Sequence, residues 1–293
     1  MIKRGLNINN KKILITGAKG QLAGEFIKIL KAKNYDFIAL TKDELDIASL
    51  DKVLDVLRTI KPCFIINCAA YNLVDDAEKD WKAAYSVNGL GVKNLALAAH
   101  EIESILVHFS TDYVFDGEKG DPYTIADKPN PINTYGRSKL LGESFLANLG
   151  YPKYYLIRTS WVFGNSKNSF TTKLIEWMSK NSQLRIVDDQ ISSPTYARDL
   201  AYITLKLLET GNYGLYHISN SEFCSRYEWA EFIASKLGWK GKIEPAKSKE
   251  FNSPAKRPKF SALDIFPIDE ILGISISSWK DATLRYLHFE VLS

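Results

Sequence analysis

The first half of the chain alternates short apolar runs with amphipathic stretches, and this alternation constrains the fold more than any other feature. The apolar runs have the length and continuity of strands that are buried on both faces. They lie at residues 12–16, 36–40, 64–68, 105–109 and 154–158. Between them, apolar residues recur at helical spacing, with helices expected over 90–100 and 134–149 and Ser49 as the N-cap of another. Such alternation predicts βαβ units, and therefore a parallel sheet with helices on both faces.

The second half has a less regular pattern. Helices are expected over 169–181, 197–209, 226–237 and 278–289, a short strand at 185–187, and a long loop over 240–259. We therefore predict an α/β fold with a Rossmann-like doubly wound parallel sheet in residues 1–165. The first ten of these residues, 1–10, are expected to form a flexible leader. Residues 166–293 are expected to form mainly a smaller substrate-binding domain, some of whose elements return to the first.

Composition narrows the class of protein. The net charge is +4 over 293 residues and the charges are dispersed, which argues against nucleic acid or a membrane surface as a partner. No apolar run is long enough to span a membrane, and the start of the chain lacks the apolar segment of a signal peptide. Cys63, Cys68 and Cys224 match no zinc spacing, and a disulfide scaffold is not expected, so we predict a cytoplasmic protein.

A glycine-rich turn follows the first predicted strand. Gly17 and Gly20 stand where the chain passes from strand to helix, the position at which a backbone approaches a dinucleotide pyrophosphate. The alternative is an ordinary tight turn. The second strand ends in Thr41-Lys42 and lacks the carboxylate that binds the ribose of NAD. Lys42 is either a partner for the 2′-phosphate of NADP or a solvated surface lysine.

Tyr135 and Lys139 lie four residues apart on a predicted helix, so their side chains share one face. An ammonium near a phenol lowers the phenol's pKa and makes it a proton donor near neutral pH. Tyr202 and Lys206 have the same spacing but no comparable surroundings, and we interpret them as a chance pair. Thr111 ends a predicted strand at the edge where parallel sheets bind ligands. Asn88 either orients Lys139 through a water or backbone group or caps local structure.

Longer stretches around these residues resemble the extended short-chain dehydrogenase/reductase superfamily and, within it, the dTDP-4-dehydrorhamnose reductases. The resemblance covers nearly the whole chain and rests on matches in the same order along it. They lie at residues 65–78, 109–117, 131–143, 158–164, 187–199 and 257–264.

The resemblance implies a function. NADPH or NADH would reduce the C4 keto group of a dTDP-sugar, dTDP-4-dehydro-β-L-rhamnose, and a homodimer is possible within the family. Catalysis is implied for Tyr135 as the proton donor, Lys139 as the ligand of the nicotinamide ribose and Thr111 as the residue that positions phenol and substrate. The implied cofactor ligands are Gly17, Gly20, Gln21, Leu22, Asp46, Ile47, Ala69, Ala70, Tyr71, Asn88, Tyr135 and Lys139. The implied substrate contacts are Val74, Thr111, Asp112 and Trp161.

The chain departs from the family pattern at three positions. Ala23 replaces a third glycine, which bears on helix–strand packing. Thr41 replaces an acidic residue at the ribose, which leaves the choice between NADH and NADPH open. Ile125 stands where relatives often carry a glutamate, and some relatives hold Mg²⁺ at a dimer contact, so no metal is expected.

Two other functions compete with reduction. Sugar-nucleotide dehydratases of the superfamily carry an acidic residue directly after Thr-Asp, whereas Tyr113 follows Asp112 here, and epimerases resemble the chain less in this segment. A non-catalytic, nucleotide-binding regulatory subunit is the third hypothesis. The presence of Thr111, Tyr135 and Lys139 together argues against it.

Overall fold

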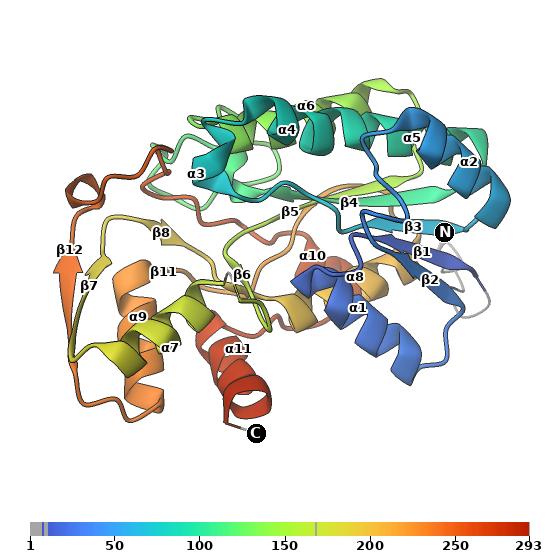
Figure 1. The fold of residues 1–293 in the computed structure, drawn as a ribbon. Helices are drawn as coiled ribbons and strands as arrows, with labels where there is room; N and C mark the ends of the chain where they lie inside the picture. The colour runs from blue at the N-terminus through green and yellow to red at the C-terminus, as the bar shows by residue number, and fades with distance from the viewer. Residues whose placement is uncertain (1–7, 9–10, 168, 293) are drawn as a thin grey trace.

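A six-stranded parallel sheet runs through the larger lobe of the protein (Figure 1), in the order β10-β5-β4-β3-β1-β2. The computed structural model describes residues 8, 11–167 and 169–292. The leader expected at 1–10 lies outside the described residues except for Ile8, which is buried in the core. The strands are β1 (Ile13–Thr16), β2 (Phe37–Leu40), β3 (Phe64–Asn67), β4 (Ile105–Thr111), β5 (Tyr154–Thr159) and β10 (Gly214–His217).

Helices cover both faces of this sheet, as the continuous apolar strands predict. Successive strand residues point to opposite faces, so Ile13 and Ile15 belong to one core cluster and Leu14 to another. The first cluster packs against α1 (Gln21–Ala32), α8 (Ala197–Thr210) and α10 (Ile268–Leu272). The second packs against α2 (Leu50–Ile60), α5 (Gly91–Glu101) and α6 (Thr134–Asn148). The predicted fold class is confirmed.

The strand order reverses beside β1. The chain goes from β1 to β2 on one side and then crosses to β3 on the other. Ligands of such sheets bind where the order reverses, outside the carboxyl ends of the strands. The ends of β1 and β3 are therefore the expected position of a ligand.

Strand β10 comes from the second half of the chain and pairs with β5. At four residues, beginning with glycine, it carries too weak a pattern to be predicted from the sequence. The second half also supplies α8, which packs against α1. Residues on both sides of 165 thus build the larger lobe.

The smaller lobe has its own aromatic core, which includes Phe163, Trp229 and Trp279. Its helices are α7 (Phe170–Lys180), α9 (Arg226–Lys236) and α11 (Trp279–Tyr286). Its strand pairs are β6 (Val162–Phe163) with β9 (Thr195–Tyr196), β8 (Ile191–Ser192) with β11 (Cys224–Ser225), and β7 (Gln183–Val187) with β12 (Lys242–Ala246). The long loop expected over 240–259 is wrong at 242–246, because that segment pairs in parallel with β7. Pro245 within it obscured the strand pattern.

The remaining elements are short. They are α3 (Val74–Ala77), α4 (Trp81–Tyr85), the π-helices Ser86–Leu90 and Leu287–Val291, and the 3₁₀ turns Asp112–Val114 and Ser248–Glu250. Cys63, Cys68 and Cys224 are free. Among the described residues, no helix has the length and apolar character needed to cross a membrane.

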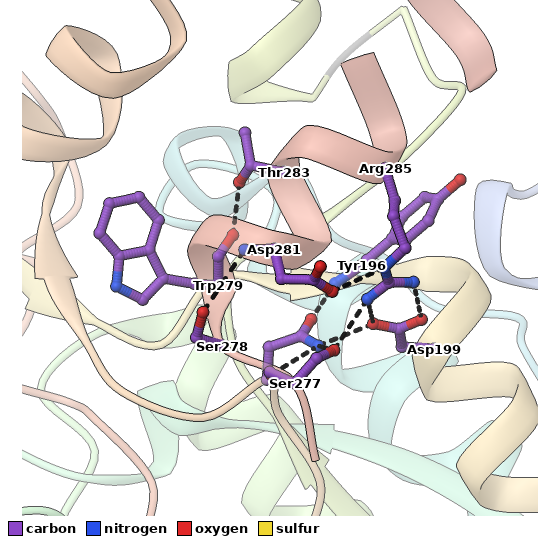
Figure 2. Close-up of polar contacts among 9 residues, drawn as sticks. Tyr196, Asp199, Ser277, Ser278, Trp279, Asp281, Thr283 and Arg285 are labelled. Atoms are coloured by element: carbon purple, nitrogen blue, oxygen red, sulfur yellow. Dashed lines mark hydrogen bonds and ion pairs between the residues drawn. The ribbon is translucent and has the colours of Figure 1, made fainter. Parts of the chain in front are cut away.

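A polar network joins α11 to the start of α8. Arg285 donates two hydrogen bonds of 2.6 Å to Asp199, one to each carboxylate oxygen, and a third of 2.8 Å to Asp281 on its own helix. Figure 2 shows the Arg285 and Asp199 side chains pointing toward one another, with Ser277 beside them. Asn220 donates to Asp199 and accepts from the backbone N–H of Tyr196. Since α8 packs on α1, this network fixes the smaller lobe against the larger one.

Candidate active site

The glycine turn brings the end of β1 against the end of β3. Gly17 has a φ of +67°, and a Cβ at this residue would lie 2.8 Å from the backbone of Ala69. The N–H of Gly20 donates to the Gly17 carbonyl at 2.8 Å, and α1 begins at the next residue without a side-chain cap. An uncapped helix N-terminus with a close, bare backbone suits a pyrophosphate. These residues therefore fit a dinucleotide.

The other predicted cofactor residues follow β1 and β2 along the chain. Gln21 donates to the Val162 carbonyl at 3.1 Å, while its own side-chain oxygen is buried without a hydrogen-bond partner. Asp46 accepts from the backbone N–H of Ala48 at 3.0 Å, and Ile47 is buried. Leu22 is half-buried on α1.

The departures from the family pattern have visible consequences. Ala23 is fully buried in the core between α1 and the sheet, so the added methyl group is packed there. Thr41 donates to Glu44 through both its backbone N–H and its hydroxyl, each at 2.8 Å. Lys42 is exposed.

Asn88 acts on two neighbours at once. It sits in the π-helix Ser86–Leu90, a distortion that is frequent at functional sites. Its side chain accepts from the backbone N–H of Tyr71 at 2.9 Å and donates to the carbonyl of Tyr71 and the hydroxyl of Ser138. Asn88 thus fixes the Ala69-Ala70-Tyr71 segment against α6 through Ser138, the residue before Lys139. Within the part of the chain that the structure describes, the hydrogen bond of the Lys139 ammonium goes to the Phe109 carbonyl and not to Asn88.

Tyr135 lies in the first turn of α6, close to the end of β4. Asn133 caps the helix by accepting from the N–H of Gly136 at 2.7 Å. A Cβ at Gly136 would lie 2.1 Å from the carbonyl of Tyr113, so glycine is what allows α6 to approach the turn after Thr111. The rings of Tyr113 and Tyr135 meet edge to face at 6.0 Å, and the backbone N–H of Tyr113 donates to the hydroxyl of Thr111 at 3.2 Å. Thr111 and Tyr135 therefore both neighbour Tyr113 at the carboxyl end of β4.

Lys139 is buried on the same face, but its effect on the phenol differs from the expectation. Its ammonium donates to the carbonyl of Phe109, and burial lowers the pKa of Lys139 to about 8, partly offset by Glu143. Burial also raises the pKa of Tyr135, and the Thr111 hydrogen bond offsets this only in part. The expected lowering of the phenol's pKa by Lys139 is therefore not seen, because desolvation dominates and the ammonium is directed to the backbone.

The predicted substrate residues come from three segments. Val74 begins α3 and is half-buried. Asp112 is buried, and hydroxyl groups of the protein reach both of its oxygens. Trp161 has a φ of +41°, rare for a bulky residue, and the Arg226 guanidinium stacks on its ring at 3.5 Å from the centroid. Trp161 also packs against the aromatic core of the smaller lobe.

Three residues at the site carried no predicted role. Tyr113 packs on Tyr135, Arg226 stacks on Trp161, and Arg257 pairs at 2.6 Å with Asp75, the residue after Val74. Arg257 belongs to a stretch that matched the family, and that match was its only signal. Arg226 begins a helix with no motif of its own.

Tyr202 and Lys206, which we interpreted as a chance pair, lie on α8 and not on α6. Tyr202 is exposed on α8, and Lys206 pairs with Glu209 at 3.3 Å. Within the described ranges, no group of three or more His, Cys, Asp or Glu side chains is arranged to hold a metal ion.

Together, the doubly wound sheet, the glycine turn at its switch point and the Thr–Tyr–Lys set beside it define an extended short-chain dehydrogenase/reductase. Residues 11–290 match the family model described as RmlD substrate binding domain. The chain belongs to this family of oxidoreductases, as its motifs predicted.

Individual relatives match along nearly their whole length. The chain is 39% identical to the spore coat polysaccharide biosynthesis protein SpsK of Bacillus subtilis, covering 94% of this chain and 96% of SpsK. It is also 39% identical to a dTDP-4-dehydrorhamnose reductase of Aggregatibacter actinomycetemcomitans, covering 92% and 96%. The crystal structure of a dTDP-4-dehydrorhamnose reductase from Bacillus anthracis in complex with NADP superposes with a TM-score of 0.91 at 38% identity, covering 95% of this chain and 99% of that one.

Proposed function

We propose that this protein uses NADPH or NADH to reduce the C4 keto group of dTDP-4-dehydro-β-L-rhamnose, which yields dTDP-L-rhamnose. The observation that carries the proposal is the placement of Tyr135 and the buried Lys139 at the carboxyl end of β4, where Lys139 donates to the Phe109 carbonyl, together with a turn that fits a dinucleotide. The relatives named as dTDP-4-dehydrorhamnose reductases support the choice of substrate.

Each residue of the site has a role in this reaction. The bound nicotinamide supplies a hydride to the carbonyl carbon. The phenol of Tyr135 donates its proton to the oxygen of the same carbonyl, and Thr111 would position the phenol and the substrate. Lys139 is buried and fixed to the Phe109 carbonyl, within α6, where it would bind the nicotinamide ribose. The Gly17–Gly20 turn and the Asn88-held Tyr71 segment would flank the cofactor.

The identity of the reduced sugar rests on similarity alone. A dTDP-4-keto-6-deoxy-D-glucose reductase of Streptomyces niveus is 33% identical, covering 85% of this chain and 87% of that protein. It favours a second candidate, reduction of a keto group at the same position of a D-configured dTDP-sugar. Elimination chemistry is disfavoured, because the buried side chain after Asp112 is the phenol of Tyr113 and not a carboxylate.

The proposal is tested by mixing the purified protein with each reduced dinucleotide and each 4-keto-6-deoxy sugar nucleotide, and following the loss of nicotinamide absorbance. We expect turnover with the L-sugar, and a Tyr135→Phe variant that binds cofactor normally but turns over about 10²–10⁴-fold more slowly. The matched control is Tyr202→Phe, which removes an exposed phenol from the surface of α8 and should leave the rate unchanged. Absence of turnover with every pair would rule out reduction and favour a non-catalytic nucleotide-binding role.

A further inference from the structure

Arg226 carries a half-buried guanidinium that stacks on aromatic rings and has no anionic partner. Its guanidinium carbon lies 3.5, 4.8 and 5.6 Å from the ring centroids of Trp161, Phe170 and Trp229. Within residues 11–167 and 169–292, no ion pair and no hydrogen bond involves this guanidinium. The buried guanidinium of Arg158, in contrast, donates to both oxygens of Glu143.

A guanidinium in this state is costly for the fold. Burial lowers the pKa of Arg226 to about 10, and the charge of Arg257 acts in the same direction, whereas Asp112 favours the protonated form without bonding to it. Stacking uses the flat face of a guanidinium and leaves the N–H donors, which lie in its plane, without acceptors. Because unused donors on a partly desolvated cation are unfavourable, they indicate a site for an anion from outside the chain.

The backbone that precedes Arg226 is tied to the end of β4. Ser225 pairs with Ile191 where β11 and β8 form their two-residue ladder. Ser192, also in β8, donates its hydroxyl to Asp112 at 3.1 Å, and Asp112 follows β4 directly. The ladder therefore holds the start of α9 to the carboxyl end of β4, the edge at which parallel sheets bind ligands.

The ring beneath the guanidinium is tied to the dinucleotide turn. Trp161 comes two residues after β5, and the carbonyl of the next residue, Val162, accepts from Gln21 at 3.1 Å. Gln21 is the first residue of α1, directly after the glycine turn. Arg226 thus stacks on a tryptophan that lies beside the candidate cofactor site and that the family resemblance assigns to the sugar nucleotide.

We propose that Arg226 binds phosphate oxygens in the diphosphate of the sugar nucleotide, while Trp161 holds the guanidinium in position. The inference rests on the proposed function, which supplies a dTDP-sugar as the substrate, and it adds a substrate-binding residue that carried no motif in the sequence. A guanidinium suits this group because its planar fork can donate two parallel hydrogen bonds to phosphate oxygens. The pyrophosphate of the cofactor is the other source of phosphate at this site, and the experiment separates the two.

The test measures the binding of three ligands and needs no turnover. Calorimetry follows dTDP and NADPH, and ligand-observed NMR follows thymidine, which has no phosphate. Arg226→Met removes every donor and keeps an unbranched side chain against the ring. We expect the affinity for dTDP to fall by about 10–100-fold, and the affinities for thymidine and NADPH to stay at the wild-type values.

The matched control is Arg185→Met, which changes the net charge equally by removing an exposed guanidinium from β7 of the same lobe. Its affinity for dTDP should match that of the wild type. An equal loss of dTDP affinity in the two variants would overturn the proposal, because it would show a general effect of net charge. Equal losses for dTDP and thymidine in Arg226→Met would overturn it as well, since a distorted pocket affects both ligands. So would a loss for NADPH that equals or exceeds the loss for dTDP.

If Arg226→Met does not fold, Arg226→Lys takes its place. Lysine keeps the positive charge but lacks the planar fork, so dTDP should bind more weakly while thymidine binds as before. Unchanged dTDP affinity in Arg226→Lys would contradict the proposed contact.

The two hypotheses fail separately. If the wild type binds dTDP through Arg226 but reduces no sugar nucleotide, the reductase proposal falls and the phosphate contact stands. If the L-sugar is reduced while Arg226→Met keeps its affinity for dTDP, the reductase proposal stands and this inference falls. A wild-type protein that does not bind dTDP would overturn the inference whatever the reductase assay shows.

Discussion

At the scale of single residues, the glycine turn is the clearest case of a backbone that only one residue type allows. Gly17 combines a left-handed φ with the close approach to Ala69, so both the conformation and the space exclude a side chain. Gly24, seven residues later in α1, has nothing within 4 Å of its Cβ position. Replacement by alanine is therefore expected to have opposite effects on stability at Gly17 and at Gly24.

We expect Gly17→Ala to lower the free energy of unfolding by more than about 1 kcal/mol, from the left-handed backbone alone, and to weaken dinucleotide binding. Gly24→Ala should instead stabilise the protein by about 0.5–1 kcal/mol, because alanine is favoured inside a helix. Urea unfolding and a fluorescence titration with NADPH measure the two effects. Equal stability and affinity in the two variants would contradict the role given to the turn.

Thr111, Tyr135 and Lys139 could be named from the sequence because each belongs to a local pattern: the end of a buried strand and a four-residue helical spacing. Arg226 and Arg257 could not, because their place beside Tyr113 depends on how α9 and residues 253–261 fold back onto the larger lobe. The direction of the Tyr135 pKa shift was also beyond the sequence, since burial decides it. Local patterns thus predict candidate catalytic residues, and tertiary packing decides how their pKa values are shifted.

At the scale of elements, β5 and α6 are joined by an ion pair in the core. Arg158 donates to both oxygens of Glu143, the shortest bond being 2.7 Å, and stacks over Phe115. The side chains are only 4% and 5% exposed. Since a buried charge without its partner is strongly unfavourable, each residue depends on the other.

Glu143→Ala should therefore lower the free energy of unfolding by about 3–5 kcal/mol. The control is Glu176→Ala, which breaks a pair of 2.5 Å with Lys180 on the surface of α7, where both side chains are more than half exposed. This surface change should cost at most about 0.5 kcal/mol. Urea denaturation measures the free energy of unfolding of both variants. Similar losses of this free energy in the two would show that the buried pair is not the link between β5 and α6.

The strands of the first half were predictable for a physical reason that the later ones lack. A strand buried on both faces is apolar throughout, whereas β6, β8, β9 and β11 are two-residue ladders whose pairing depends on distant partners. β12 carries Lys242 and Glu244 followed by Pro245 and pairs only with β7, so its residues resemble a loop.

At the scale of the whole molecule, buried groups with shifted pKa values determine how the free energy of unfolding changes on acidification. Burial lowers the pKa of His217 to about 3 and that of His108 well below its usual range, so both stay neutral in the folded protein. On unfolding, each takes up a proton below a pH of about 6.5. Asp112 acts oppositely, because its pKa of about 6 in the folded protein lies above that of an exposed carboxyl.

Between pH 6 and 5 the unfolded chain holds roughly one and a half to two more histidine protons than the folded chain, while the folded chain holds roughly half to one proton more on Asp112, so unfolding carries a net uptake of about one proton. Stability should therefore fall by roughly 1.4 kcal/mol per pH unit on acidification through this range. His217→Gln should flatten this slope. Urea midpoints at the two pH values provide the measurement, and a protein that becomes more stable toward pH 5 would contradict the neutral state of the two histidines.

The origin of β10 has a consequence for how the protein is made. When the ribosome has released residues 1–165, the backbone of β5 is complete but its outer partner, Gly214–His217, has not yet emerged. An open strand edge is a template for pairing with other chains. The nascent first half therefore carries an unprotected edge until about fifty more residues have been synthesised, and a fragment that ends near residue 165 keeps that edge permanently.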